Sequence, residues 1–403
     1  MWTSFIGKRK EINMKKLNIM VVTGLAIFIF FFIFMNFDKT SFVFTRFYKK
    51  IDQITQEDTS QKQIFTYENE EMLFTFLIQN MSESQKAIYT NFLNSKSPDE
   101  IISTGKDILS ESQGLFLLYL LNRGMKQEFD QVLDWTMNNL YLSNNTFSWL
   151  KRKTGETVKV NALIDDLRIV RALILAHDMW GDARYIHIAE DTSKALKHYN
   201  TSNSIPRDFY DSATNLKVDY ITLCYLDLYT IRKIAEFDKD WYNIYFHSHE
   251  IITNAKIMDT GLYELQYNPE KSSYWSEEEI SMILSVYTML HLAEVGQYDK
   301  GGMAWLWKEY EKYNKLYANY CPQTLEPTTD IESTALYSLA ARLFYQTGDI
   351  EKARQLLEES EKFQIKNIDS EIFGSFGNEQ TQEVYSFDNL QYLLSASQIY
   401  GNK

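Results

Sequence analysis

Acidic side chains stand at the start of several apolar segments of the sequence. They include Glu111 in SESQG, Asp165 and Asp166 in IDDL, Glu278 in SEEEI and Asp388 in SFDN. An acid in the first turn of a helix stabilises backbone N–H groups that have no partner. Carboxylates that face one another instead raise each other's pKa, and a pair split into one protonated and one ionised member performs general acid–base chemistry. The choice between these interpretations depends on whether the segments meet in space.

The elements that position these acids are helices. Hydrophobic periodicity predicts twelve of them, at 69–94, 109–123, 125–141, 161–179, 183–199, 217–236, 239–255, 277–295, 303–319, 332–347, 350–363 and 386–400. Every second one is apolar nearly all round, as in LFLLYLL and MILSVYTML, whereas the others have one charged face. A helix that is apolar all round is buried, and a helix with one apolar stripe lies on the surface. Six inner helices within six outer ones predict an all-α (α/α)6 barrel, in which the inner N-termini and their acids share one rim.

A helical-repeat solenoid is the alternative all-α architecture. The segment ARLFYQTGDIEKARQLLEES (341–360) is similar to a tetratricopeptide hairpin. Such a solenoid repeats at a fixed period of about 34 residues. The sequence has no second copy with matching landmark residues, which favours the barrel.

The composition excludes some functions. The 403 residues include only 5 Pro and 15 Gly, which favours long helices, and the net charge of −13 argues against nucleic-acid binding. No Cys/His cluster has metal-ligand spacing, so neither a metal nor an organic cofactor is expected. Cys224 and Cys321 could pair in an oxidising compartment, but the apolar run around Cys224 favours a buried free thiol.

The N-terminus carries a membrane signal. Residues 17–37 form an uncharged apolar stretch of about twenty residues, long enough to span a bilayer, and basic residues precede it. No small-x-small cleavage site follows. We expect a single-pass signal anchor with residues 1–16 cytoplasmic, 38–68 as a stalk and 69–403 outside the cytoplasm. A cleaved and secreted form is the alternative.

An ordered series of motifs resembles glycoside hydrolase family 8. The motifs are SESQG, FDQVLDWTMNNL, FSWL, ALIDDLRIVRALILAHDMWG, VDYITL, TGLYEL and VYSFDNLQYLL. Together they cover most of residues 70–400. The resemblance implies an (α/α)6 fold and hydrolysis of β-linked glucans and related polysaccharides with inversion, without a cofactor.

The resemblance also implies roles for the acids. Glu111 matches the general acid, which protonates the leaving oxygen. Asp166 matches the second acid of an Asp-x-Asp motif that contacts the sugar at the cleavage site. Ile164 replaces the first acid of that motif, and the adjacent Asp165 offers a partial substitute.

The catalytic base is less clearly marked. The family often has an Asp before Ala-x-Arg at the start of the eighth helix, where this chain has Glu277, Glu278 and Glu279 and no Arg. Glu278 aligns best. An inverting enzyme needs its carboxyl groups roughly 6.5–9.5 Å apart to admit a water molecule, and Glu is one methylene longer than Asp. Another rim acid could instead be the base, or the base is lost.

Further residues are expected to hold the substrate. Trp149 matches an aromatic residue that stacks on a sugar ring, and Tyr220 matches the Tyr of a Ser-Tyr pair in which Asp219 replaces Ser. The other expected contacts are Asp165, Tyr274, Trp275, Tyr385 and Asp388.

These observations predict a membrane-anchored extracytoplasmic glycosidase that cleaves a β-linked bacterial polysaccharide or exopolysaccharide by a single displacement. The expected partners are the polysaccharide and, through the N-terminal helix, the membrane. An association with exopolysaccharide synthesis machinery is implied by the resemblance alone. The alternative is a catalytically impaired glycan-binding or scaffold protein of exopolysaccharide synthesis and export.

Overall fold

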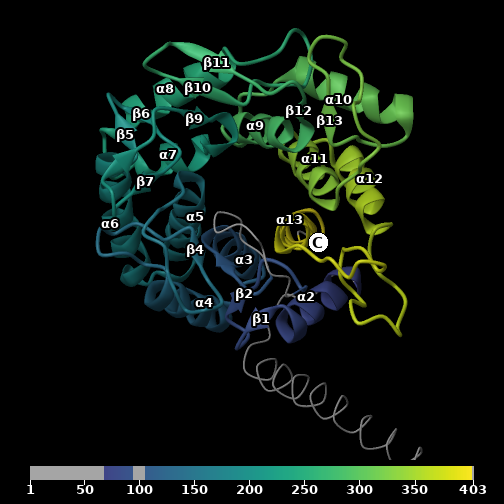
Figure 1. Ribbon diagram of the computed structural model, residues 1–403, viewed down its shortest axis with the longest axis horizontal. Helices are drawn as coiled ribbons and strands as arrows, with labels where there is room; N and C mark the ends of the chain where they lie inside the picture. Colours follow the sequence, from purple (N-terminus) through teal and green to yellow (C-terminus); the bar gives the residue numbers. More distant parts are fainter. Residues whose placement is uncertain (1–67, 94–104, 402–403) are drawn as a thin grey trace, which may run out of the picture. The chain divides into compact units, whose positions relative to one another are not determined.

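In the computed structural model, the described residues are 68–93 and 105–401, and twelve α-helices lie within them (Figure 1). Six of them form an inner ring: α3 (Ser110–Asn122), α5 (Leu163–Trp180), α7 (Leu228–Ile234), α9 (Met282–Glu294), α11 (Thr334–Gln346) and α13 (Ser386–Ile399). Each packs on the next, and α13 packs on α3, so the ring is closed. Closure confirms the barrel and excludes an open solenoid.

The outer helices cover this ring. They are α2 (Glu68–Asn80), α4 (Lys126–Asn139), α6 (Ala183–Tyr199), α8 (Trp241–Thr253), α10 (Lys300–Tyr313) and α12 (Ile350–Glu361). Buried residues on α4 and α12 are confined to one stripe, whereas α3 and α11 are buried nearly all round. The apolar pattern of the sequence therefore separated the two layers correctly.

Short antiparallel strands lie in the segments that lead into the inner helices. Their pairs are β1 (Ser82–Glu83) with β2 (Ala87–Ile88), β3 (Ile108–Leu109) with β4 (Leu150–Lys151), β5 (Thr201–Ser202) with β6 (Ile205–Pro206), β7 (Tyr210–Asp211) with β8 (Leu216–Lys217), and β12 (Ile280–Ser281) with β13 (Asn319–Tyr320). β9 (Ile221–Thr222), β10 (Gln266–Asn268) and β11 (Ser273–Trp275) form a three-stranded sheet in the order β11-β10-β9.

Four predicted helices begin or end elsewhere, and one of them, expected at 303–319, spans Lys300–Tyr313 as α10. The first ends at Asn80, because the chain turns into the β1–β2 hairpin. The helix expected at 217–236 starts with strands and the 3₁₀ turn η1 (Leu223–Tyr225), and α7 begins only where Asp227 accepts the N–H of Thr230. The helix expected from residue 277 begins at Met282, because Ile280 and Ser281 pair with β13.

Two further predictions concern the chain's chemistry and topology. Cys224 is buried and both cysteines are free, which confirms the free-thiol interpretation. The predicted membrane span at 17–37 lies outside the described residues. Among the residues that are described, no helix has the length and apolar character needed to cross a bilayer.

Candidate active site

Glu111 lies in the first turn of α3 and does not cap it. The N-cap position is Leu109, and no side chain caps this helix. Ser110, the other polar residue at the start, donates its hydroxyl to Asp165 Oδ2 across the helix interface at 2.9 Å. The polar residues of SESQG therefore join α3 to its neighbours instead of capping it: Ser110 bonds to α5, and Ser112 bonds to Ser386 of α13.

A close approach of α3 and α5 brings their first turns together. A Cβ atom added to Gly114 would lie only 2.9 Å from Arg168 Cβ, so this position tolerates no side chain without movement. Arg168 NH1 then lies 3.5 Å from Glu111 Oε2 and 2.8 Å from Asp165 Oδ1. One guanidinium thus holds two carboxylates from neighbouring helices at the mouth of the barrel.

A third acid reaches this mouth from α13. Asp388 Oδ1 accepts the backbone N–H of Ala335 at 3.0 Å and the hydroxyl of Ser333 at 2.9 Å, so it ties α13 to the start of α11. Its negative charge is close enough to Glu111 to raise the pKa of that carboxyl. We define the mouth cluster as Glu111, Asp165, Arg168 and Asp388.

The mouth cluster holds Glu111 in a state suited to proton donation. Burial raises the pKa of Glu111 to about 7; Arg168 opposes this rise, and the charges of Asp165 and Asp388 add to it. The Glu111 side chain is nevertheless 27% exposed, so a ligand can reach it. A carboxyl that keeps its proton near neutral pH and is accessible can act as a general acid.

Asp165 differs from Glu111 in its hydrogen bonds. Burial raises the pKa of Asp165, whereas the Arg168 guanidinium and the Ser110 hydroxyl lower it. Both of its carboxylate oxygens are occupied by these two donors. Such a group is fixed in position, which suits orientation of a substrate more than proton transfer.

Asp166 is separate from the mouth cluster, and the sugar contact expected of it does not fit the structure. The residue is 0% exposed. Its Oδ1 accepts the Phe147 N–H at 2.9 Å, and its Oδ2 accepts the Asn161 side-chain amide at 2.7 Å. Burial raises the pKa of Asp166 well above its ordinary range. Adjacent residues on a helix point in different directions, so Asp165 faces the mouth while Asp166 secures the segment that contains Trp149.

The predicted base is not part of the mouth cluster. Glu277, Glu278 and Glu279 are exposed and precede β12 instead of opening a helix. Glu279 accepts the Asn319 side-chain amide at 3.2 Å, and Glu278 forms no hydrogen bond or ion pair with the described residues. Glu278 is therefore free to move, and the structure does not hold it next to Glu111.

Three of the expected aromatic contacts lie in rim segments. The carbonyl of Trp149 accepts the N–H of Ser110 at 3.1 Å, which places this half-buried residue beside the turn of Glu111. Tyr385 directly precedes α13 and is 47% exposed. Tyr220 is half-buried immediately before β9.

The two neighbouring aromatics of β11 diverge. The Tyr274 hydroxyl donates to the carbonyl of Ile251 on the outer helix α8 at 2.8 Å. Side chains alternate along a strand, and Trp275 is accordingly 54% exposed. Trp275 is available to a ligand, whereas the phenol of Tyr274 has a structural partner.

Arg168 was missed by sequence reasoning. It follows Asp165 by three residues on the same helix, a spacing that brings opposite charges together, and this signal was present in IDDLR. Tyr287 on α9 was also missed. The Arg168 guanidinium carbon lies 5.4 Å from its ring centroid, a contact between distant segments with no local sequence signal.

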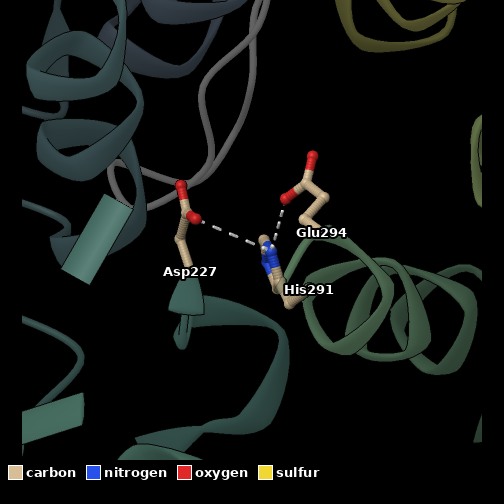
Figure 2. Close-up of side chains that lie close together, drawn as sticks. All are labelled: Asp227, His291 and Glu294. Atoms are coloured by element: carbon tan, nitrogen blue, oxygen red, sulfur yellow. Dashed lines mark ion pairs between the residues drawn. The ribbon is translucent and has the colours of Figure 1, made fainter. Parts of the chain in front are cut away.

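A second charged layer fills the barrel interior next to the mouth cluster. Asp227, His291 and Glu294 lie close together, with His291 Nδ1 3.6 Å from Glu294 Oε2 and 4.0 Å from Asp227 Oδ1 (Figure 2). Arg171 donates to both oxygens of Glu294, at 2.8 and 2.9 Å. Arg342 NH2 lies 3.7 Å from the same carboxylate. We call these five residues the interior network.

The interior network has the residue types of a metal site but a different charge balance. Two guanidinium groups already neutralise its two carboxylates, and they lower the pKa of Glu294 below its usual range. A divalent cation would have to displace Arg171 from Glu294 and would face the positive charge of Arg342. The network therefore fits a buried ion-pair system that joins α5, α7, α9 and α11.

The closed helical ring and the acidic mouth define an (α/α)6 barrel with a cluster of carboxyl groups at one end. The sequence matches the family described as glycosyl hydrolases family 8 over residues 99–299. The chain belongs to this family.

Three comparisons illustrate the relationship. YdaJ of Bacillus subtilis (strain 168) is 29% identical over 320 residues, which is 78% of this chain and 85% of YdaJ. A solved structure described as a novel alpha-amylase from Clostridium perfringens is 35% identical, with a TM-score of 0.78 over 82% of this chain and 97% of that one. The structure of PssZ from Listeria monocytogenes is 22% identical, with a TM-score of 0.64 over 80% and 93% of the respective chains, and supports the fold alone.

Proposed function

We propose that the protein is an inverting glycosidase in which Glu111 protonates the leaving oxygen. The observation that carries this proposal is the accessible Glu111 carboxyl with a pKa of about 7 inside the mouth cluster. Arg168 holds Glu111 and Asp165 in a fixed relation, and Asp165 orients the sugar at the cleavage site in place of Asp166. Family membership supports this reaction class.

Glu278 is the proposed base that activates water. Its free carboxylate precedes β12, in one of the rim segments that lead into the inner helices. Asp388 is the competing candidate, because its charge already influences Glu111. However, one of its oxygens is committed to Ser333 and Ala335. A glycan-binding scaffold without turnover is the second candidate function, because Glu278 is not part of the mouth cluster and Asp388 is engaged by Ser333 and Ala335.

The proposed substrate is a polysaccharide. The family resemblance implies a β-linked one, whereas the Clostridium perfringens relative, by its description, is an alpha-amylase. Both linkages therefore belong in the test. We further propose that residues 17–37 anchor the enzyme in the membrane with the barrel outside the cytoplasm, where it acts on exopolysaccharide beside the machinery that synthesises it.

The test uses the full-length chain on α-glucans, β-glucans and the host exopolymer, with release of reducing ends as the readout. Wild type is expected to act on at least one of them. Glu111→Gln is expected to lower the rate about 10²–10⁴-fold while polymer binding persists. Glu278→Gln is expected to be similarly inactive, with Glu277→Gln as the matched control.

Two outcomes contradict parts of the proposal. Inactivity of Asp388→Asn together with an active Glu278→Gln would transfer the base role to Asp388. Polymer binding without release by wild type would support the scaffold function.

A further inference from the structure

An open depression lies beside the end of α10. It holds about 610 Å³, and its lining includes Tyr313, Tyr317, Glu326, Thr328 and Asp330. None of these residues belongs to the mouth cluster or the interior network.

The depression opens at the same end of the barrel as Glu111. The N–H of Ala318 donates to the carbonyl of Ile331 at 2.9 Å, which joins the two segments that form its walls. Ser333 follows Asp330 by three residues, a span of at most roughly 10 Å of chain. Its hydroxyl donates to Asp388 of the mouth cluster. A polymer bound at Glu111 therefore has this depression within reach.

The walls of the depression are fixed without a ligand. The Tyr313 hydroxyl donates to Glu326 Oε2 at 2.6 Å, and Lys312 lies 3.3 Å from the same atom. The rings of Tyr313 and Tyr317 pack edge to face, with centroids 5.1 Å apart and planes at 73°. Preorganised side chains lose little conformational entropy on binding.

The chemistry of the lining selects the ligand. Asp330 is exposed and forms no hydrogen bond or ion pair with the described part of the chain. Carboxylates only accept hydrogen bonds when ionised, so Asp330 fits a ligand that donates them. A lysine side chain lies over one face of each tyrosine ring, and the remaining ring surface is available to C–H groups. A pyranose carries both hydroxyl donors and an apolar face, so it matches Asp330 and the tyrosine rings.

We propose that this depression is an accessory subsite that binds a pyranose unit of the polysaccharide, remote from the bond being cleaved. The inference rests on the proposed function. It assigns Tyr317 and Asp330 to substrate retention and predicts that long chains bind more tightly than short ones.

The test compares polymer and a short oligosaccharide of the same linkage as substrates of the full-length chain. Tyr317→Ala and Asp330→Asn are each expected to raise KM for the polymer about three- to tenfold, with kcat and the kinetics on the short substrate unchanged. Tyr317→Phe retains the ring and is expected to restore the polymer KM. Tyr298→Ala is the matched control, because Tyr298 is 45% exposed and follows α9, at the opposite end of an inner helix.

An unchanged polymer KM in both variants would overturn the inference. If wild type cleaves no glycan, the proposed function fails, and the subsite is tested separately by polymer binding to Glu111→Gln. Loss of that binding on adding Tyr317→Ala supports the subsite, and retained binding overturns it.

Discussion

The mouth cluster and the interior network both combine acids with arginines, but the pKa values of Glu111 in the first and Glu294 in the second are shifted in opposite directions. The mouth cluster places three acids around one arginine, and the pKa of each of these acids is raised. The interior network places two acids between two arginines, and the pKa of Glu294 is lowered. In the mouth cluster burial raises these pKa values and one arginine does not offset it, whereas at Glu294 two arginines overcome the effect of burial. The ratio of charges distinguishes the reactive layer from the supporting layer.

The largest expected effect follows from breaking the balanced layer. Glu294→Gln leaves two buried arginines, Arg171 and Arg342, with Asp227 as their one remaining acid in the network, so the free energy of unfolding is expected to fall by about 3–5 kcal/mol at neutral pH. Denaturant unfolding measures this change. Lys194→Ala, which removes an exposed pair with Asp191, is the control and should change stability by less than about 1 kcal/mol. An equal effect of the two variants would contradict the supporting role of Glu294.

Removal of an acid from the mouth cluster should instead raise the free energy of unfolding. Glu111 has a folded-state pKa of about 7 against an ordinary value of 4.5, so ionising it destabilises the folded state increasingly as pH rises between these values. Glu111→Gln is therefore expected to stabilise the protein at pH 8, by at most about 3 kcal/mol. At pH 4 the difference should disappear. Thermal unfolding at both pH values measures it, and a loss of stability at pH 8 would remove the distinction between the layers.

Asp166, which lies outside both groups, tests whether a buried acid next to the mouth cluster is structural. Both carboxylate oxygens of Asp166 accept hydrogen bonds from N–H groups. In Asp166→Asn an NH2 group replaces one oxygen, so it faces one of these N–H donors and that hydrogen bond is lost. We expect a loss of about 1–3 kcal/mol in unfolding free energy. Chemical unfolding at pH 7 checks this value. A variant with wild-type stability but no activity would return Asp166 to the substrate-binding role that the sequence implied.

The smallest expected effect is a change in pH dependence. A general acid must be protonated, so activity should decline as pH rises through about 7. Asp165→Asn removes a negative charge that raises the pKa of Glu111, so the alkaline limb of the kcat/KM profile should move to lower pH. An unshifted limb would show that Asp165 does not act on Glu111 electrostatically.

The sequence predicted the helical layers well because amphipathicity is a local property. All twelve expected helices correspond to α2–α13, and LFLLYLL and ALILA are buried as expected. The predicted start of α9 was wrong, because Ile280 and Ser281 pair with a strand about forty residues away. Such long-range pairing leaves no periodic signal in SEEEIS.

The site was predicted in part for a similar reason. Glu111 was identified by its motif, and its proximity to Asp165 follows from the parallel inner helices. The different surroundings of Asp165 and Asp166 were not predictable, because they depend on which carboxylate meets Ser110 and which meets Asn161. The interior network was also missed, since its members come from four helices.

Gly114 sets the spacing on which the proposed chemistry depends. Because hydrogen takes the place of a methyl group there, two backbones come near enough for a single guanidinium to bridge acids from both. The proposed proton donation thus depends on a residue that has no functional group of its own. Any redesign of this barrel must therefore keep a glycine at position 114, where α3 and α5 approach each other.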